Sequence, residues 1–308
     1  MARIAAYEDV KVTRKQREVK GGYAWRTEFF LPPAGDKTEP HAFLAERCFN
    51  GGIRPHFHDV DQFQVIVSGS GAIGRHSLPH HTVHFARAHT PYGPIVPNQE
   101  GLGFLTLRAR RAAGQFIVPD KIDMLRSVPD RRPWQITEEA NFDGSGDVAM
   151  HTFSRIRDSN GLAAYSLKLR PHTTATAPDP SVGDGQYLII TRGSLMHDGR
   201  DHQAITMVFV KPDEPPFQLV AGAQGLEALA LNFPRQIPSA QTTVTPSVAG
   251  SAKFRVWQCM LCAFTYDEAK GMPDEGVAPG TRWEDVPESW TCPDCAATKT
   301  DFEMVIVG

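Results

Sequence analysis

Four cysteines near the end of the sequence have a spacing that can bind a metal ion. Cys259 and Cys262 form one Cys-x-x-Cys pair, and Cys292 and Cys295 form a second. Each pair makes a tight turn that directs two thiolates toward one point, so the two pairs together predict a closed tetrahedral sulfur site. The spacing alone fits zinc as well as iron. A site filled by four thiolates leaves no position for a substrate.

A second group of candidate ligands lies in the first third of the chain. Eight of the twelve histidines fall between residues 41 and 89. His56 and His58 are two residues apart, so on a strand both side chains point to the same face. We expect them to bind a second metal ion. Imidazole ligands favour ferrous iron, with zinc, manganese, nickel or copper as alternatives.

An internal repeat supplies the elements that must position these histidines. Residues 62–107 align with residues 186–231 without a gap. Both copies contain short apolar or alternating segments separated by Gly and Pro, which favours antiparallel sheets over alternating strands and helices. We expect a mostly-β body of two similar barrels, with one helical turn near 122–126. The expected strands are 63–67, 83–86, 104–107, 187–190, 207–210 and 228–231.

The second copy serves as an internal control for the histidines. His56 matches His172, but His58 is replaced by Thr174, so we expect the second copy to be structural. His84 is replaced by Val208, as expected if His84 points into the first barrel. His84 is therefore a candidate third ligand.

Composition bounds the organisation and the function classes. The 308 residues suffice for two or three domains. No apolar run is long enough to span a membrane or serve as a secretion signal, so we expect a cytoplasmic protein without a membrane partner. The last 55 residues carry four Lys and Arg against ten Asp and Glu, which argues against nucleic-acid binding. The expected domains are 1–115, 116–235 and 254–308, with a linker at 236–253.

The segment 254–303 resembles rubredoxin over its whole length. Besides the four cysteines, the resemblance rests on an aromatic cluster and on the surrounding Pro, Gly and acidic positions. It implies one iron held by Cys259, Cys262, Cys292 and Cys295 that transfers one electron at a time. Rubredoxins usually have Gly after the second and the fourth cysteine, where this chain has Ala. The shared aromatic residues are Phe264, Tyr266, Trp283, Trp290 and Phe302.

The segment around His56 resembles the first cupin motif, a Gly followed by His-x-His, a carboxylate position and a second Gly. With the repeat, this makes residues 40–235 similar to a bicupin, two tandem cupin barrels in one chain. The carboxylate position holds Gln62, and the histidine position of the second motif holds Tyr92. The resemblance thus implies metal ligands among His56, His58 and Gln62, to which the repeat adds His84, and a catalytic role for His56, His58, Gln62 and Tyr92.

The combination of both modules indicates an oxidoreductase. Monooxygenation needs two external electrons for each turnover, whereas dioxygenation and isomerisation need none. We therefore expect a mononuclear non-heme iron oxygenase that acts on a small organic substrate in the first barrel. Its rubredoxin would be reduced by an external rubredoxin reductase, and the protein would be a monomer or a homodimer. Two alternatives remain: a ring-cleaving dioxygenase with an accessory rubredoxin, and a non-catalytic bicupin that binds a small molecule.

Overall fold

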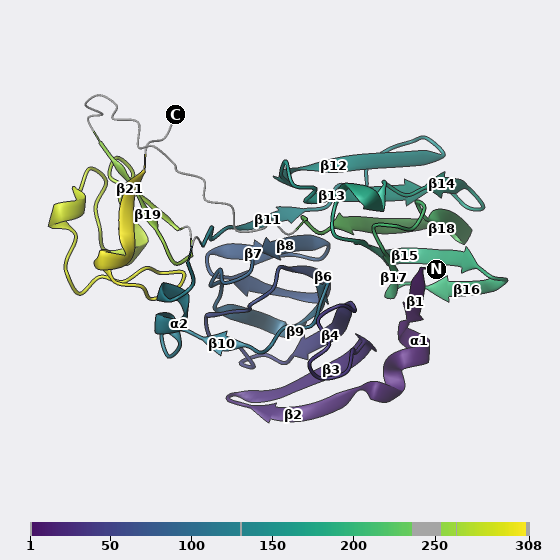
Figure 1. Cartoon of the computed structure of the whole chain (residues 1–308), viewed down its shortest axis with the longest axis horizontal. Coiled ribbons are helices and arrows are strands. Elements are labelled where there is room, and N and C mark those ends of the chain that lie inside the picture. Colours follow the sequence, from purple (N-terminus) through teal and green to yellow (C-terminus); the bar gives the residue numbers. More distant parts are fainter. Residues whose placement is uncertain (1, 130, 236–253, 263, 306–308) are drawn as a thin grey trace.

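The computed structural model describes residues 2–129, 131–235, 254–262 and 264–305. Two antiparallel sheets lie side by side, and a small C-terminal domain packs against the end of the first sheet (Figure 1). The expected linker 236–253 and Ala263, one of the two alanines at a usual glycine position, lie outside the described residues. No helix in the described ranges is both long and apolar enough to cross a membrane.

The first sheet surrounds the histidine segment. Its strand order is β11-β8-β6-β9-β4-β3-β2, with β7 paired to β6. A separate short ladder pairs β5 with β10. The strands are β2 (Lys15–Val19), β3 (Gly22–Phe30), β4 (His41–Arg47), β5 (His56–Phe57), β6 (Gln62–Ile73), β7 (His76–Leu78), β8 (Thr82–Ala86), β9 (Ile95–Arg108), β10 (Phe116–Ile117) and β11 (Gln135–Glu139).

The second sheet repeats the central part of the first. Its order is β1-β17-β15-β18-β13-β12, with β14 paired to β18 and β16 paired to β15. The register is equivalent: Phe63 lies opposite Leu107, and Tyr187 lies opposite Leu231. The strands are β1 (Arg3–Ala6), β12 (Val148–Arg157), β13 (Ala163–Leu169), β14 (Thr174–Thr176), β15 (Gln186–His197), β16 (Arg200–Gln203), β17 (Thr206–Val210) and β18 (Gln218–Asn232).

Alternation along the repeated strands gives each sheet two different faces. Phe63 and Val65 on β6 enter an apolar cluster shared by both sheets, and so do their equivalents Tyr187 and Ile189 on β15. This cluster joins the two copies through corresponding faces. Gln62 and the other alternate residues of β6 face the interior of the first sheet, which is partly polar. In the second sheet the position of Gln62 holds Gln186, and the following alternate positions, Leu188 and Ile190, belong to an apolar cluster.

The two sheets exchange edge strands, so the expected boundary at 115/116 does not separate them. β1 pairs with β17 of the second sheet, and β11 pairs with β8 of the first. A short strand can add to the edge of either sheet, because its pattern of apolar and polar residues does not specify which strand it pairs with. The helical turn expected near 122–126 is present as α2 (Ile122–Arg126). A further short helix, α1 (Tyr7–Val10), follows β1.

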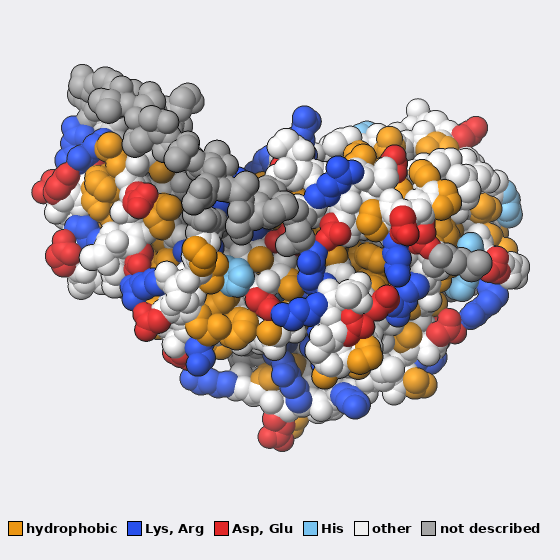
Figure 2. All heavy atoms as spheres, viewed as in Figure 1, with side chains coloured by type: hydrophobic (Ala, Val, Ile, Leu, Met, Phe, Trp, Pro, Cys, Tyr) orange, Lys and Arg blue, Asp and Glu red, His pale blue; other side chains and the backbone are white. Residues whose placement is uncertain are grey.

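The C-terminal domain is a three-stranded sheet with loops that carry the cysteines. The strand order is β20-β19-β21. Its strands are β19 (Val256–Cys259), β20 (Thr265–Asp267) and β21 (Phe302–Val305). On the face of the molecule shown in Figure 2, acidic and basic side chains of the described residues are interspersed, in keeping with the small net charge of −3. The 3-10 helices in the described ranges are Lys11–Thr13, Pro180–Val182, Pro273–Glu275, Trp283–Asp285 and Lys299–Asp301.

Candidate functional site

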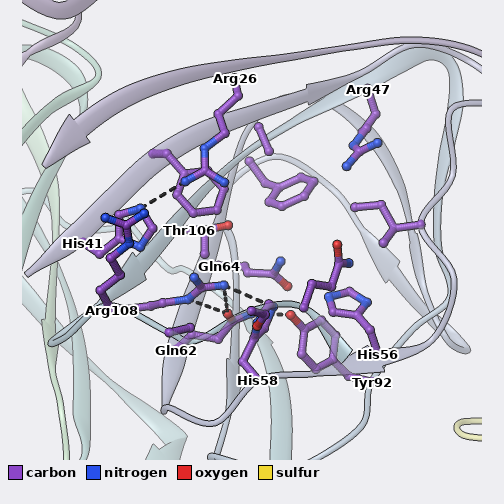
Figure 3. A pocket seen from close by; sticks show the side chains of 18 of the residues that line it. Arg26, His41, Arg47, His56, His58, Gln62, Gln64, Tyr92, Thr106 and Arg108 are labelled. Carbon is purple, nitrogen blue, oxygen red and sulfur yellow. Dashed lines mark hydrogen bonds between the residues drawn. The ribbon is translucent and has the colours of Figure 1, made fainter. Parts of the chain in front are cut away.

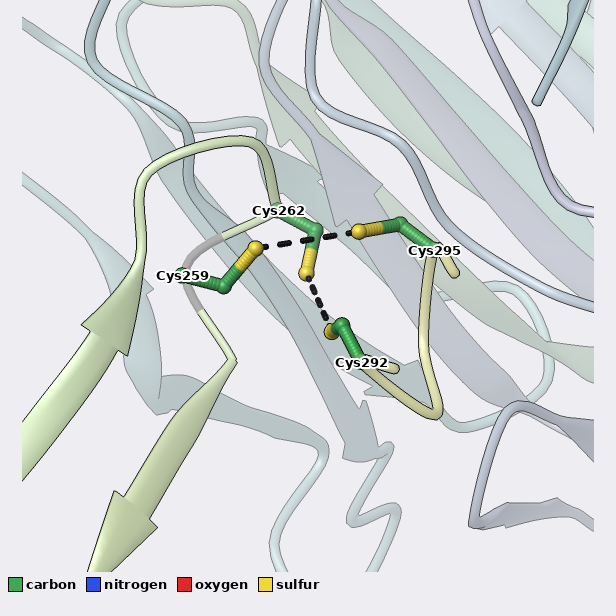
Figure 4. A group of neighbouring side chains, drawn as sticks. All are labelled: Cys259, Cys262, Cys292 and Cys295. Atoms are coloured by element: carbon green, nitrogen blue, oxygen red, sulfur yellow. Dashed lines mark hydrogen bonds between the residues drawn. The ribbon is translucent and has the colours of Figure 1, made fainter. Parts of the chain in front are cut away.

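The four cysteines of the C-terminal domain come together as predicted. Their Sγ atoms point toward one another (Figure 4), and all lie within 4.8 Å of one another. The separations are 3.7 Å between Cys259 and Cys295 and 3.4 Å between Cys262 and Cys292. A tetrahedral ion with bonds of about 2.3 Å would hold sulfurs about 3.8 Å apart. The geometry therefore fits one metal ion bound by four thiolates.

Burial makes this site depend on a cation. All four cysteines are buried, and burial raises the pKa of the Cys262 and Cys292 thiols well above the usual range. Four thiolates cannot persist together in such surroundings without a positive ion. The backbone of the second loop is shaped for the site, because Ala296 adopts the left-handed conformation (φ 61°) that glycine usually provides.

A cavity of about 270 Å³ opens inside the first sheet. His56, His58, Gln62 and Tyr92, the four residues expected to be catalytic, all line it (Figure 3). His84 does not line the cavity, although the centre of its ring lies 5.2 Å from that of Tyr92. The structure thus gathers four of the five candidate residues of the first sheet around one space.

Both histidines are held in the orientation that metal-binding histidines use. His56 donates its Nδ1 proton to the carbonyl oxygen of Arg54 at 2.8 Å, and His58 donates to that of Gly114. A carbonyl can only accept, so Nε2 of each ring keeps its lone pair. Burial lowers the pKa of His56 to about 4, so its ring is neutral at pH 7. Both rings therefore direct a lone pair from Nε2, the nitrogen that would bind a metal ion.

Two of the candidate ligands, His58 and Gln62, accept hydrogen bonds from Arg108, a residue that the sequence did not indicate. Arg108 donates from Nη2 to Nε2 of His58 at 3.1 Å and to Oε1 of Gln62 at 2.9 Å. Gln62 in turn donates to the hydroxyl of Tyr92, and burial raises the pKa of that hydroxyl, so it stays protonated. Among the described residues, only the four cysteines form a group of three or more His, Cys, Asp or Glu ligands.

The cavity therefore offers two histidine ligands to a metal ion but not the full set of protein ligands expected from the cupin pattern. His56 and His58 fit a two-histidine site, with the other positions left to water or substrate. The described residues do not assemble the four protein ligands that the cupin pattern implies, and a metal ion at His58 would require Arg108 to leave its Nε2. A metal ion held here would thus keep open coordination positions.

Arg47 is a second buried residue of the cavity that sequence reasoning missed. It lies at the end of β4 and lines the cavity with 9% of its surface exposed. The repeat held the signal for both arginines. By strand register, Arg108 corresponds to Asn232 and Arg47 to Leu169. The first copy thus has a buried charge at two positions where the second copy has none.

The sequence of the C-terminal domain matches one protein family. The rubredoxin family model matches residues 256–302. Rubredoxin-1 of Pseudomonas aeruginosa is 64% identical over 52 residues, which are 17% of this chain and 94% of that protein. Rubredoxin of Acinetobacter baylyi is 59% identical over 51 residues, or 17% of this chain and 94% of that protein. The chain belongs to the rubredoxin family through this domain. The four cysteines are the rubredoxin iron site.

The two sheets resemble solved structures in fold alone. A bacterial pirin from Escherichia coli, solved in complex with nickel(II), has a TM-score of 0.50 at 12% identity and covers 77% of this chain and 100% of its own. A Nostoc punctiforme protein, provisionally assigned as a dioxygenase, has a TM-score of 0.50 at 13% identity, with 80% and 88% covered. These neighbours confirm the cupin-like fold expected for the two repeats, and the rubredoxin domain follows them in the chain. The expected closed barrels are instead open sheets, since the outermost described strands of each sheet do not pair with each other.

The rubredoxin domain packs directly against the wall of the first cavity. Phe57, which is fully buried, belongs to the same apolar cluster as the four cysteines, together with Val118 and Leu125. Phe57 lies between His56 and His58 in the sequence, and neighbouring residues of an extended segment point to opposite sides. Phe57 therefore faces the rubredoxin core while both histidines face the cavity.

Three arginines of the first cupin domain and its connection to the second fix this contact. Arg131 donates to the carbonyl oxygens of Met260 and Leu261, the two residues between the first pair of cysteines. The same guanidinium also donates to the carbonyl of His89 in the first cupin domain. The rubredoxin domain is thus held with its first Cys-x-x-Cys turn against the first cupin domain. The other two contacts are ion pairs, Arg126 with Asp301 at 3.1 Å and Arg75 with Asp294 at 3.8 Å.

Proposed function

We propose that this chain is a rubredoxin-coupled oxygenase that acts on a small organic substrate in the cavity of its first cupin domain. The observation that carries the proposal is the placement of Phe57. One side of this short strand contacts the cluster around the iron site, and the other side presents His56 and His58 to the cavity. An electron leaving the rubredoxin iron would reach the cavity wall through the apolar cluster that contains both the cysteines and Phe57.

The electron count favours monooxygenation over dioxygenation. A monooxygenase takes one O₂, two electrons and two protons, places one oxygen atom in a substrate C–H bond and releases the other as water. A rubredoxin iron carries one electron, so the domain would be reduced twice for each turnover. A dioxygenase puts both oxygen atoms into its substrate and would leave this electron path without a use.

His56 and His58 would hold the metal ion of the reaction, which would supply oxygen activation when bound. The other cavity residues would position the substrate and shield the reacting atoms from water. Gln62 and Tyr92 form a buried hydrogen-bonded pair beside the histidines, and Arg108 presents a cation to the same space. The aromatic residues around the cavity keep bulk water from the reacting atoms.

The electrons would come from a separate reductase. One Gly-x-Gly-x-x-Gly sequence is present at 69–74, but it lies on strand β6 and its turn to β7. A dinucleotide-binding glycine motif instead joins a strand to a helix. The described part of the chain therefore gives this sequence no dinucleotide-binding context, which supports an external rubredoxin reductase as the donor.

A second candidate function rests on Arg108. Because its guanidinium engages His58 and Gln62, the first cupin domain could serve as a non-catalytic small-molecule-binding domain with only the rubredoxin iron in the chain. Metal analysis separates the two candidates. The oxygenase holds two metal ions per chain, and the binding protein holds one.

The test compares the two copies of the repeat. His56→Ala/His58→Ala should reduce the metal content from two ions to one per chain and reduce oxygen uptake with a chemical reductant to background, with the rubredoxin spectrum unchanged. His172→Ala is the matched control, because His172 is the exposed counterpart of His56 in the second copy. It should leave metal content and oxygen uptake unchanged. A double variant with full metal content and oxygen uptake would refute the proposal.

A further inference from the structure

We propose that the cavity of the first cupin domain binds a small organic carboxylate, held by the guanidinium groups of Arg47 and Arg108. The proposal rests on the proposed function in taking the bound carboxylate as the substrate. The binding itself needs neither a metal ion nor an electron.

The lining of the cavity is strongly basic. Five arginines line it, and no Asp or Glu of the described residues does. His41 also lines the cavity but adds no further positive charge, because burial lowers its pKa and keeps it neutral. The five arginines are Arg17, Arg26, Arg47, Arg108 and Arg111.

Arg47 carries the strongest indication of a missing anion. Its side chain is nine-tenths buried and faces the cavity (Figure 3), and its Nε is buried without a hydrogen-bond partner. No ion pair or ring contact joins it to any other described residue. An unpaired buried cation is costly, whereas a carboxylate can accept two parallel hydrogen bonds from one guanidinium.

Arg108 likewise lacks a negative partner. It is 5% exposed, and its hydrogen bonds go only to the neutral side chains of His58 and Gln62. Two other lining arginines differ in this respect. Arg26 is paired with Glu28, and Arg111 donates to the carbonyl oxygen of Pro32. Arg17 is exposed and Arg111 is only partly buried. The buried charge without a negative partner thus lies with Arg47 and Arg108. Figure 3 shows these two on opposite sides of the cavity.

The repeat shows that neither charge is needed to build the fold. The second sheet has Leu169 and Asn232 in the corresponding positions, and Leu169 packs into an apolar cluster. Asn232 accepts from Gln186 where Arg108 donates to Gln62. The same strand framework therefore folds around neutral residues, which leaves a ligand as the reason for the arginines of the first copy.

The remaining lining argues for an organic anion over an inorganic one. Trp25, Phe43 and Phe104 provide apolar and aromatic surface beside the arginines. A volume of about 270 Å³ lies just below the usual range of ligand pockets, which begins at about 300 Å³. A carboxylate with a small apolar or aromatic body matches both the charge and the surface.

Calorimetric titration of the full iron-loaded chain tests the proposal. Acetate, benzoate and phenylacetate are titrated beside acetamide, benzamide and phenylacetamide, and inorganic phosphate is titrated separately. We expect an aromatic carboxylate to bind at least about tenfold more tightly than its amide, because the neutral amide cannot form an ion pair or accept two parallel hydrogen bonds on two oxygens. Arg47→Met should weaken carboxylate binding at least about tenfold, and Arg47→Lys, which keeps the charge, should weaken it less.

Arg54→Met is the matched control, because Arg54 is exposed, pairs with Asp120 and does not line the cavity. It should bind as the wild type does. The proposal is overturned if no carboxylate binds, if amides bind equally well, if phosphate alone binds, or if Arg47→Met binds normally while folded by circular dichroism. Cys292→Ser, which disables electron transfer, should still bind the carboxylate, so a failed oxygenase assay does not decide this titration.

Discussion

Arg131 offers the sharpest test of how the rubredoxin domain is held. Two of its hydrogen bonds reach the carbonyls of Met260 and Leu261 across the interface. A hydrogen bond from a charged donor contributes about 1.5–3 kcal/mol, and the lower value suits a half-buried side chain. Arg131→Met should thus weaken docking by about 3 kcal/mol, or roughly a hundredfold in the ratio of docked to undocked molecules.

Hydrogen–deuterium exchange measures the loss of docking directly and needs no activity assay. Leu125 of α2 is buried in the cluster that contains the rubredoxin cysteines, so undocking should expose α2 and accelerate exchange of its amides. Arg132→Met removes the same charge from the neighbouring, exposed position and should leave exchange unchanged. Equal exchange in the two variants would refute the role given to Arg131.

Three further predictions concern the cysteines, the cavity and a buried histidine. Cys292→Ser should abolish the red colour and the protease resistance of residues 254–305 but leave the cupin domains folded, and a variant that stays red would contradict the assigned iron site. Arg108→Gln should raise the affinity of the first cavity for added zinc about tenfold by freeing Nε2 of His58, as measured by competition with a chelator; unchanged affinity would contradict the competition. Burial lowers the pKa of His84 to about 3, so below about pH 6.5 the unfolded chain binds a proton that the folded chain does not, and stability falls by about 1.4 kcal/mol per pH unit from this group. Urea unfolding at pH 6.5 and pH 5 should therefore show about 2 kcal/mol less loss in His84→Gln than in the wild type, and equal losses would refute this reasoning.

Local spacing was enough to predict the four-cysteine metal site, and the resemblance to rubredoxin specified iron. The two Cys-x-x-Cys pairs are each formed within a single turn, so their geometry depends little on the rest of the chain. The repeat likewise predicted the central strands, because each copy repeats the alternation that separates the shared cluster from the interior. His56 and His58 share a face for the same local reason.

The rest depends on contacts that local patterns do not specify. Arg47 and Arg108 stand at strand ends, where a charged residue usually reaches solvent, and only alignment with Leu169 and Asn232 marks them as unusual. The exchange of β1 and β11 between the sheets depends on long-range edge pairing. The sequence also gave no sign that Phe57 would join the core of the rubredoxin domain.

The central claim is that electrons from the rubredoxin iron enter the first cavity within one chain. Stopped-flow mixing of the fully reduced protein with oxygen, followed by the return of the red colour, measures this transfer directly. The account predicts a rate that does not change when the protein concentration is varied a hundredfold, and that falls at least about tenfold in His56→Ala/His58→Ala. A rate proportional to protein concentration, or one unchanged in the double variant, would contradict it.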